Sequence, residues 1–247
     1  MNHTTNHKSW FPFGFGSVLA SHRLFCLPFA GGGASFFLPW RKALANLAVV
    51  PVQYPGRETR MAEACRTDLA QLVEELVQAI LPQLDRPYYL LGYSLGAKVG
   101  FAMCHRLAAL GAPAPDLFLA LAHGAPDVPP GLPGAYRLPD AEFFEYVQRY
   151  GGLPDIVLGD PELMRMLVPI LRADIGLVEH AVPNQALTCP ILAYAGKQDH
   201  AADSVAVGGW RRFAQNGFAL RSFDGGHFFA RTASDFLPTL AGDLKCV

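Results

Sequence analysis

Residues 88–110 constrain the fold of this chain more than any other stretch of its sequence. Residues 88–91 form a short apolar run typical of a buried strand, and residues 97–110 can form a helix. Between them lies G-Y-S-L-G (92–96), which predicts a serine on a sharp turn from strand to helix. The glycines permit close approach of the two backbones because they carry no Cβ. The pattern therefore predicts an exposed nucleophile at Ser94.

Apolar strands and helices alternate along much of the remaining chain. Buried strands are expected at residues 24–27, 47–54, 117–122, 191–195 and 218–223. Apolar residues at i, i+3 and i+4 spacing predict a helix over residues 68–84, begun by Thr67 or Asp68. Continuous apolar strands separated by helices are typical of a parallel sheet covered on both faces. We therefore predict an α/β fold with a mostly parallel central sheet flanked by helices.

Composition narrows the class of protein further. The chain has 247 residues, of which 51% are hydrophobic and 17% charged, as expected for a globular domain. A formal net charge of −1 gives no indication of a nucleic acid or an anionic membrane as partner. The five cysteines are scattered without a C-x-x-C pair, which favours a cytoplasmic location. No apolar run approaches the ~20 residues of a membrane span, and the apolar residues 10–20, broken by Pro12, read as a first strand or turn.

Residues 125–185 interrupt the alternation of strands and helices. A proline-rich loop is followed by helical patterns around residues 142–150 and 161–179, with no predicted strand. A helical insertion between two core strands, just after the nucleophile, is where a lid over a substrate site would lie, although an ordinary helical cover is the alternative. We predict a single domain over residues 1–247, with a core at about 10–124 and 186–247 and a helical lid insertion at about 125–185.

A serine nucleophile requires a base held in position by an acid. In chains with this elbow the acid and then the histidine follow the serine in sequence. His227 follows the last predicted strand in F-D-G-G-H-F-F (223–229), and we predict that it is the base rather than a cap of the next helix. Asp199 directly follows the strand at 191–195 and is the predicted acid. Asp203 is the alternative acid or a helix cap, and Asp224 is expected to lie in a turn.

The oxyanion that forms during acyl transfer requires two backbone donors. The amide of Leu95, next to the nucleophile, is the first predicted donor. Ala30, in the glycine-rich loop P-F-A-G-G-G-A-S (28–35), is the second, with Phe29 as the adjacent alternative. A phosphate cradle is a weaker interpretation of this loop because it lacks G-x-G-x-x-G spacing and any Gly-Lys-Ser/Thr. The chemistry requires no metal and no diffusible cofactor, and we expect none.

Five motifs together resemble those of one family. They are L-P-F-A-G-G-G-A-S (27–35), Y-P-G-R-E-T-R (54–60), G-Y-S-L-G-A (92–97), L-R-A-D (171–174) and G-G-H-F-F (225–229). They resemble the type II, or external, thioesterases that accompany nonribosomal peptide and polyketide synthetases. The resemblance implies an α/β-hydrolase fold with a helical lid and a Ser94-Asp199-His227 triad. It also implies hydrolysis of acyl groups from the phosphopantetheine arm of carrier proteins, in pathways such as antibiotic or siderophore biosynthesis.

The chain departs from the family pattern at several positions. Many members have histidine where Phe29 and Tyr93 stand, and Ser-Gly-Arg where residues 122–124 read A-H-G. Arg57 and Arg60 match the family's Y-P-G-R-x-x-R. Two roles are open for these arginines: binding a phosphate of the arm, or bracing a loop through a carboxylate, which is the favoured interpretation.

The partner implied by the resemblance is an acyl or peptidyl carrier protein domain of a synthetase. The chain has no D-S-L serine to bear a phosphopantetheine arm, so the carrier would have to bind transiently in trans, to a protein expected to be a monomer. Transient contact favours editing of stalled or misprimed carriers. A carboxylesterase or lipase-like hydrolase of small esters would use the same triad, and a non-catalytic interaction module is the remote alternative.

Overall fold

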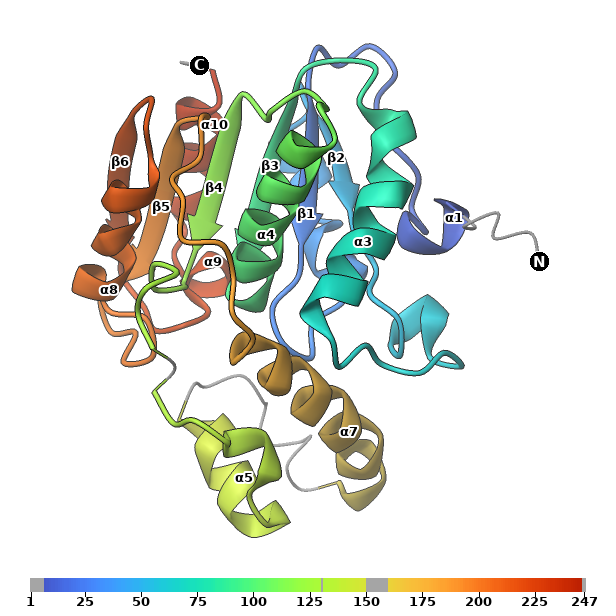
Figure 1. The fold of residues 1–247 in the computed structure, drawn as a ribbon, viewed down its shortest axis with the longest axis vertical. Coiled ribbons are helices and arrows are strands. Elements are labelled where there is room, and N and C mark those ends of the chain that lie inside the picture. The colour runs from blue at the N-terminus through green and yellow to red at the C-terminus, as the bar shows by residue number, and fades with distance from the viewer. Residues whose placement is uncertain (1–6, 130, 150–159, 246–247) are drawn as a thin grey trace.

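A computed structural model describes residues 7–129, 131–149 and 160–245, and Figure 1 shows their arrangement. Six strands form one sheet: β1 Arg23–Leu27, β2 Ala48–Pro51, β3 Tyr88–Tyr93, β4 Leu117–Leu121, β5 Ile191–Gly196 and β6 Phe218–Phe223. Their order is β2-β1-β3-β4-β5-β6, and all neighbouring strands are parallel. The predicted α/β fold with a parallel central sheet is confirmed.

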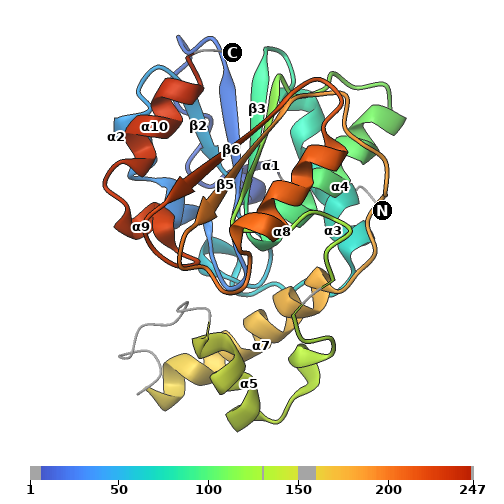
Figure 2. The ribbon, with the colours of Figure 1, turned by 90° about the vertical axis from the view of Figure 1, so that its left-hand side faces the viewer.

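Helices cover both faces of this sheet. The helices around it are α1 His7–Trp10, α2 Trp40–Ala43, α3 Leu69–Ile80, α4 Leu95–Ala109, α8 Ser204–Gly208, α9 Phe229–Thr232 and α10 Phe236–Asp243. Figure 2 shows α2, α9 and α10 on one side and α3, α4 and α8 on the other. Helix α3 begins where the sequence predicts it, because the Asp68 carboxylate accepts a hydrogen bond of 2.9 Å from the Gln71 amide.

Two apolar clusters fill the spaces between the sheet and its helices. On the α4 side, Trp210 packs against Phe101 and Phe118, with ring centroids 5.3 and 5.6 Å apart. On the α10 side, Phe236 packs against Trp40 and Tyr194, at 5.3 and 5.9 Å. Every residue of β1, β3, β4 and β5 is buried, as expected for strands covered on both faces. These strands are the rigid frame on which the loops at their carboxyl ends are held.

The segment between β4 and β5, residues 125–185, is called the cap here. It contains α5 Asp140–Gln148 and α7 Pro161–Val178, which lie together at one end of the molecule (Figures 1 and 2). Phe143, Val147 and Leu171 form a small apolar cluster within it. No strand occurs in the described part of the cap. The helical insertion thus lies where the sequence predicts it.

The chain near the N-terminus forms turns, which is one of the two structures predicted for residues 10–20. Trp10 ends α1, and residues 11–20 contain turns but no strand. The Val52 amide still donates to the Cys26 carbonyl of β1 at 3.0 Å, but the Gln53 amide donates to the Trp10 carbonyl at 2.9 Å, and β2 ends at Pro51 instead of residue 54. Trp10 and Phe11 are buried, which explains the apolar pattern of this stretch. None of the described helices is long and apolar enough to cross a membrane.

Candidate active site

The turn between β3 and α4 holds Ser94 in a strained conformation. Its φ of 51° and ψ of −115° are unusual for a residue with a Cβ. The flanking glycines are required because a Cβ on Gly92 would lie 2.2 Å from the Gly96 carbonyl oxygen, and one on Gly96 would lie 2.2 Å from that of Leu27. The Ser94 amide donates to the Leu121 carbonyl at 2.7 Å. The end of β4 therefore fixes the turn that carries the serine.

The structure brings Ser94, His227 and Asp199 together, although they are far apart in sequence. His227 Nε2 lies 2.9 Å from Ser94 Oγ, and His227 Nδ1 lies 2.8 Å from Asp199 Oδ2. The other Asp199 oxygen accepts the amides of Ala201 and Ala202 at 2.9 and 3.1 Å. The side chain of Asp199 is 1% exposed. Backbone amides thus hold one oxygen of the carboxylate in place, and the other oxygen contacts the imidazole.

The two alternative acids have other partners. Asp203 caps α8, where its carboxylate accepts the Ala206 amide at 2.8 Å. Asp224 is exposed and forms an ion pair with Lys197 at 2.8 Å. These contacts match the helix cap and the turn residue that the sequence allows for them. Asp199 is the aspartate that contacts His227.

Backbone amides with free N–H groups lie on the loop after β1 and at the start of α4. Among the described residues, none accepts a hydrogen bond from the backbone amides of Leu95, Ala30 or Phe29. The Gly31 amide, in contrast, donates to Asp174 Oδ2 at 2.8 Å. Ala30 and Ser94 both line the same cavity. The arrangement is compatible with the predicted oxyanion donors, and the choice between Ala30 and Phe29 stays a prediction.

Tyr93 connects the elbow to the loop that carries the histidine. Its hydroxyl donates to the His227 carbonyl oxygen at 2.8 Å. Burial raises the pKa of Tyr93, so the hydroxyl remains protonated and able to donate. Its ring packs against Phe29 and Phe228, with centroids 5.5 and 6.0 Å apart. No sequence pattern predicts this contact, because none pairs position 93 with position 227.

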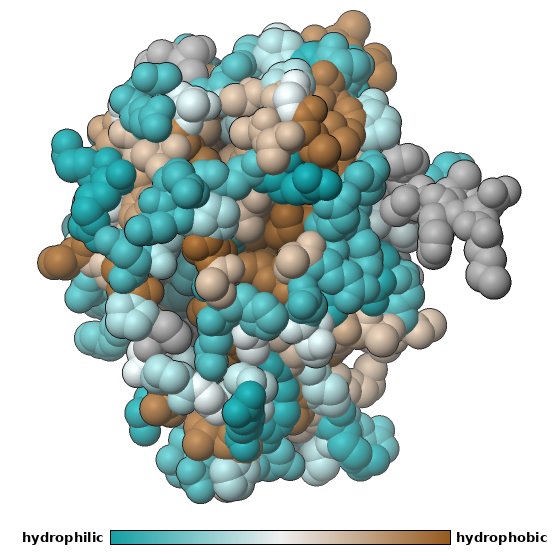
Figure 3. Space-filling view, in the orientation of Figure 1, coloured by the Kyte–Doolittle hydropathy of each residue, from teal (hydrophilic) through white to brown (hydrophobic). Residues whose placement is uncertain are grey.

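A cavity of about 780 Å³ lies beside Ser94 and His227. The loop after β1, the histidine loop and the cap all contribute to its lining, which includes Phe29, Phe36, Phe228, Leu167, Leu171 and Ile175. Figure 3 shows apolar residues recessed among hydrophilic ones in the middle of one face of the molecule. A cavity of this size and apolar character can hold an acyl chain next to the serine.

Two basic side chains line the cavity close to the serine. Lys98 lies one helical turn after Ser94, and its ammonium donates to the Val178 carbonyl at 2.5 Å. Burial lowers the pKa of Lys98 to about 8, and the opposing effect of Glu179 is smaller. The pKa of His123 falls to about 3, first through burial and then through Lys98 and His227. His123 is therefore neutral at pH 7.

Arg57 joins the cap to the body of the molecule. Its guanidinium makes a bidentate ion pair with Asp174 on α7, in which the Nη2–Oδ1 distance is 2.9 Å. The two side chains are 4% and 1% exposed. Asp174 also accepts the Gly31 amide, next to Ala30. A buried cation and anion thus link the cap helix to the predicted oxyanion loop.

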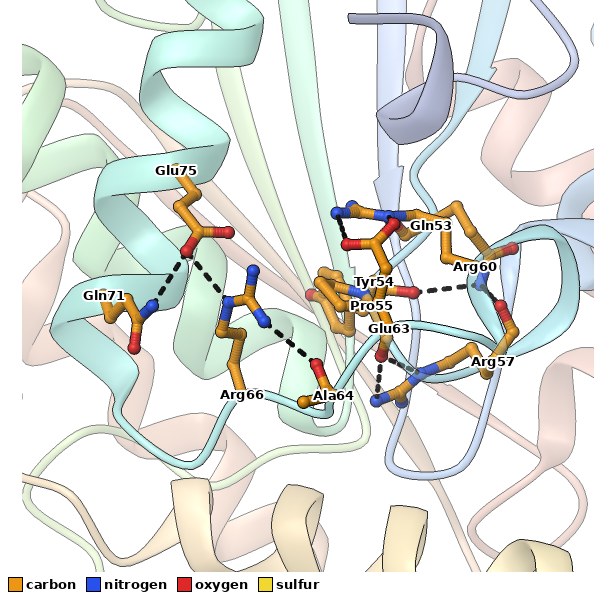
Figure 4. A network of polar contacts seen from close by, with 10 residues as sticks. All are labelled: Gln53, Tyr54, Pro55, Arg57, Arg60, Glu63, Ala64, Arg66, Gln71 and Glu75. Carbon is orange, nitrogen blue, oxygen red and sulfur yellow. Dashed lines mark hydrogen bonds and ion pairs between the residues drawn. The ribbon is translucent and has the colours of Figure 1, made fainter. Parts of the chain in front are cut away.

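Figure 4 shows the polar contacts that hold the loop 53–66 together. Arg57 also donates to the Pro55 carbonyl at 3.1 and 3.2 Å. Arg60 pairs with Glu63 at 2.6 and 2.7 Å and lies 4.1 Å above the Trp10 ring. Both arginines therefore brace this region through carboxylates, and both are buried. Neither has a guanidinium free for a phosphate.

The serine lies on a strand–turn–helix elbow, and the histidine and aspartate lie at the carboxyl ends of parallel strands. This arrangement is that of the α/β hydrolases. Within this class, the profile of the thioesterase domain family matches residues 22–245, and the chain belongs to that family. The enzyme is a hydrolase that acts on thioesters.

Relatives and solved structures agree with this assignment. The Gramicidin S biosynthesis protein GrsT of Aneurinibacillus migulanus is 35% identical over 226 residues, covering 90% of this chain and 88% of the relative. RedJ, a thioesterase of the prodiginine pathway in Streptomyces coelicolor, superposes with a TM-score of 0.84 at 31% identity, covering 95% of this chain and 92% of that one. The type II thioesterase BorB gives 0.81 at 32% identity, covering 92% and 94%. The predicted membership of the type II thioesterases is confirmed.

Proposed function

We propose that this protein removes acyl groups from the phosphopantetheine arm of carrier proteins in nonribosomal peptide or polyketide synthesis, editing stalled or misprimed carriers. The observation that carries the proposal is the chain of hydrogen bonds from Ser94 through His227 to Asp199, 2.9 and 2.8 Å long, beside an apolar cavity. The names of GrsT and RedJ place those relatives in gramicidin S and prodiginine biosynthesis, which supports this class of pathway.

The proposed first half-reaction transfers the acyl group to the serine. His227 Nε2 takes the proton from Ser94 Oγ as that oxygen attacks the thioester carbonyl carbon. The amides of Leu95 and Ala30 donate to the oxyanion, and Asp199 orients the imidazole through Nδ1. The carbon–sulfur bond then breaks, and the sulfur takes the proton from the imidazolium. This step is undemanding because a thiol has a pKa of ~8.5.

The proposed second half-reaction hydrolyses the acyl-serine. Water gives a proton to His227 and attacks the ester carbonyl, and the same amides hold the oxyanion. The bond to Ser94 Oγ breaks, the serine regains its proton, and a carboxylic acid leaves. Each step uses side chains and amides of this chain, so the proposal includes no metal or cofactor. We infer that the carrier binds transiently and that the protein acts as a monomer.

Acyl release from an acyl-loaded carrier protein tests the proposal. The wild type is compared with Ser94→Ala and with Ser204→Ala, an exposed serine that does not line the cavity, and each is also assayed with an aryl ester. We expect Ser94→Ala to lower the rate about 10³-fold or more and Ser204→Ala to leave it unchanged. Turnover of the aryl ester alone would indicate an esterase and overturn the carrier function. Full activity of Ser94→Ala would overturn the nucleophile.

A further inference from the structure

Arg231 stands at the cavity on a cluster of aromatic rings. It lies on α9, just after the histidine loop, and its side chain is exposed. Its guanidinium carbon lies 5.1 Å from the ring centroid of Phe36, 5.4 Å from that of Phe228 and 5.5 Å from that of Phe29. Arg231 and all three rings line the cavity. The charge is therefore held beside the catalytic histidine loop by cation–π contacts.

These contacts leave the hydrogen-bonding edge of the guanidinium available. A ring attracts the cation electrostatically, whereas the five N–H donors of arginine point outward in the guanidinium plane. Among the described residues, no carboxylate or carbonyl receives a hydrogen bond from the Arg231 side chain. Arg57 and Arg172, by contrast, pair with Asp174 and Asp140. A positioned guanidinium with unused donors suits a bidentate anion such as a phosphate.

The proposed substrate has such an anion. This step rests on the proposed function: a phosphopantetheine arm that delivers its thioester to Ser94 carries a phosphodiester at its other end. The lysine and arginine side chains among the described cavity residues are Lys98 and Arg231. Lys98 is half-buried and donates to the Val178 carbonyl, so Arg231 is the available cation. We propose that Arg231 binds the phosphate of the phosphopantetheine arm.

Arg231, and not Arg57 or Arg60 of the Y-P-G-R-E-T-R motif, is thus the proposed phosphate ligand. Arg57 and Arg60 are 4% and 6% exposed and engage carboxylates, so a phosphate would have to break an ion pair made by a buried arginine to reach either of them. Arg231 needs no such rearrangement. Arg231 lies on α9, two residues after G-G-H-F-F (225–229), so the proposed phosphate site is close in sequence to His227.

Two small thioesters with the same acyl group isolate the phosphate: acyl-pantetheine and acyl-4′-phosphopantetheine. The acyl-loaded carrier protein is the third substrate. The variants are Arg231→Gln, Arg231→Lys and the matched control Arg211→Gln. Arg211 is also exposed and lies 5.0 Å from an aromatic ring, that of Phe218, but it does not line the cavity. Arg211→Gln therefore makes the same change in net charge away from the site.

We expect the wild type to prefer the phosphorylated thioester about five- to tenfold in kcat/KM, mainly through KM, and to lose this preference as salt is raised. Arg231→Gln should bring the preference close to one, Arg231→Lys should retain part of it, and Arg211→Gln should retain all of it. The Lys result is informative because a lysine keeps the charge but not the bidentate edge.

Other results would overturn the inference. A wild type that hydrolyses acyl-pantetheine and acyl-phosphopantetheine equally well would overturn the phosphate site while leaving the proposed function intact. Equal losses on both small thioesters in Arg231→Gln would indicate a packing role for the side chain. A loss confined to the carrier protein would indicate contact with its acidic surface instead. Failure of the wild type on the acyl-loaded carrier would overturn the proposed function itself.

Discussion

Among single residues, Tyr93 makes the contact whose loss should affect turnover most directly outside the predicted triad. Tyr93→Phe keeps the buried ring but removes the hydroxyl that donates to the His227 carbonyl at 2.8 Å. We expect a loss of about 1–2 kcal/mol in the free energy of unfolding and a severalfold fall in kcat with little change in KM, because the loop that carries the base loosens. Urea denaturation and steady-state kinetics measure the two effects.

Tyr88→Phe is the matched control for this prediction. The Tyr88 hydroxyl also donates to a backbone carbonyl at 2.8 Å, that of Pro113, which lies outside the cavity lining. A similar loss of stability with unchanged kcat is expected. If Tyr93→Phe behaves in the same way, its hydrogen bond is structural and does not position His227.

Lys98 should make stability depend on alkaline pH. Burial lowers its pKa from an ordinary 10.5 to about 8, so between these values the unfolded chain binds more protons than the folded one. Stability contributed through Lys98 therefore rises as the pH increases from about 8 to 10.5. Relative to Lys98→Met, the wild type should gain roughly 1 kcal/mol between pH 7 and 10, since partial exposure reduces the full effect. Urea denaturation across this range is the measurement, and parallel curves would contradict the prediction.

The site residues that could be predicted from the sequence are those that belong to a local motif. Ser94, Asp199 and His227 each follow a recognisable strand, so their meeting at one edge of the sheet could be anticipated. Tyr93 and Arg231 could not, because their roles depend on partners brought close only by the fold. Asp174 had a signal, the L-R-A-D motif, but its partner could not be read from that motif.

Among the elements, α7 is joined to the body of the molecule by the buried pair of Arg57 and Asp174. Asp174→Asn leaves the Arg57 cation buried without a counter-charge, which should cost about 3–5 kcal/mol in unfolding free energy. Replacing both residues, as Arg57→Met with Asp174→Leu, removes the charge imbalance and should recover much of that stability. Denaturation of the single and double variants tests this non-additivity.

Activity of the double variant separates stability from positioning. The Gly31 amide would still lack its acceptor on α7, and the neighbouring Ala30 would be held less firmly. We therefore expect kcat to remain severalfold low in the double variant although the fold is restored. Wild-type kcat in that variant would show that the pair contributes to stability alone.

The bounds of several elements also follow from local signals, and the exceptions have physical causes. Thr67 and Asp68 are the two predicted starts of a helix, and Asp68 begins α3 through its side-chain cap. Strand β2 ends at Pro51 instead of residue 54 because Gln53 pairs with the Trp10 carbonyl. Residues 47–54 would show the same apolar pattern whether the strand ended at residue 51 or at residue 54, because the segment is buried in either case. The pattern therefore could not locate the end of the strand.

In the whole molecule, the cap and the body should differ in local stability. The body has an apolar cluster on each face of its sheet, whereas the cap has its own small cluster around Phe143, Val147 and Leu171. Its polar ties to the body include Arg57–Asp174 and Lys98–Val178. We expect amides of α5 and α7 to exchange with solvent faster than those of β3 and β4, through local opening of the cap.

Filling the cavity should change this exchange in a way that depends on chain length. Leu167 and Leu171 of α7 line the cavity beside Ser94, so a long alkyl phosphonate attached to Ser94 would bury apolar surface against the cap. A methyl phosphonate would modify the same serine without reaching α7 and serves as the control. If the cap is a lid that closes over an acyl group, we expect hydrogen exchange in α7 to slow with the long alkyl phosphonate only. Mass spectrometry measures this exchange. Two results would instead indicate that the cap is a rigid cover: equal protection of cap and sheet amides from exchange in the free enzyme, or equal effects of both phosphonates. Substrate would then enter without any opening of α7.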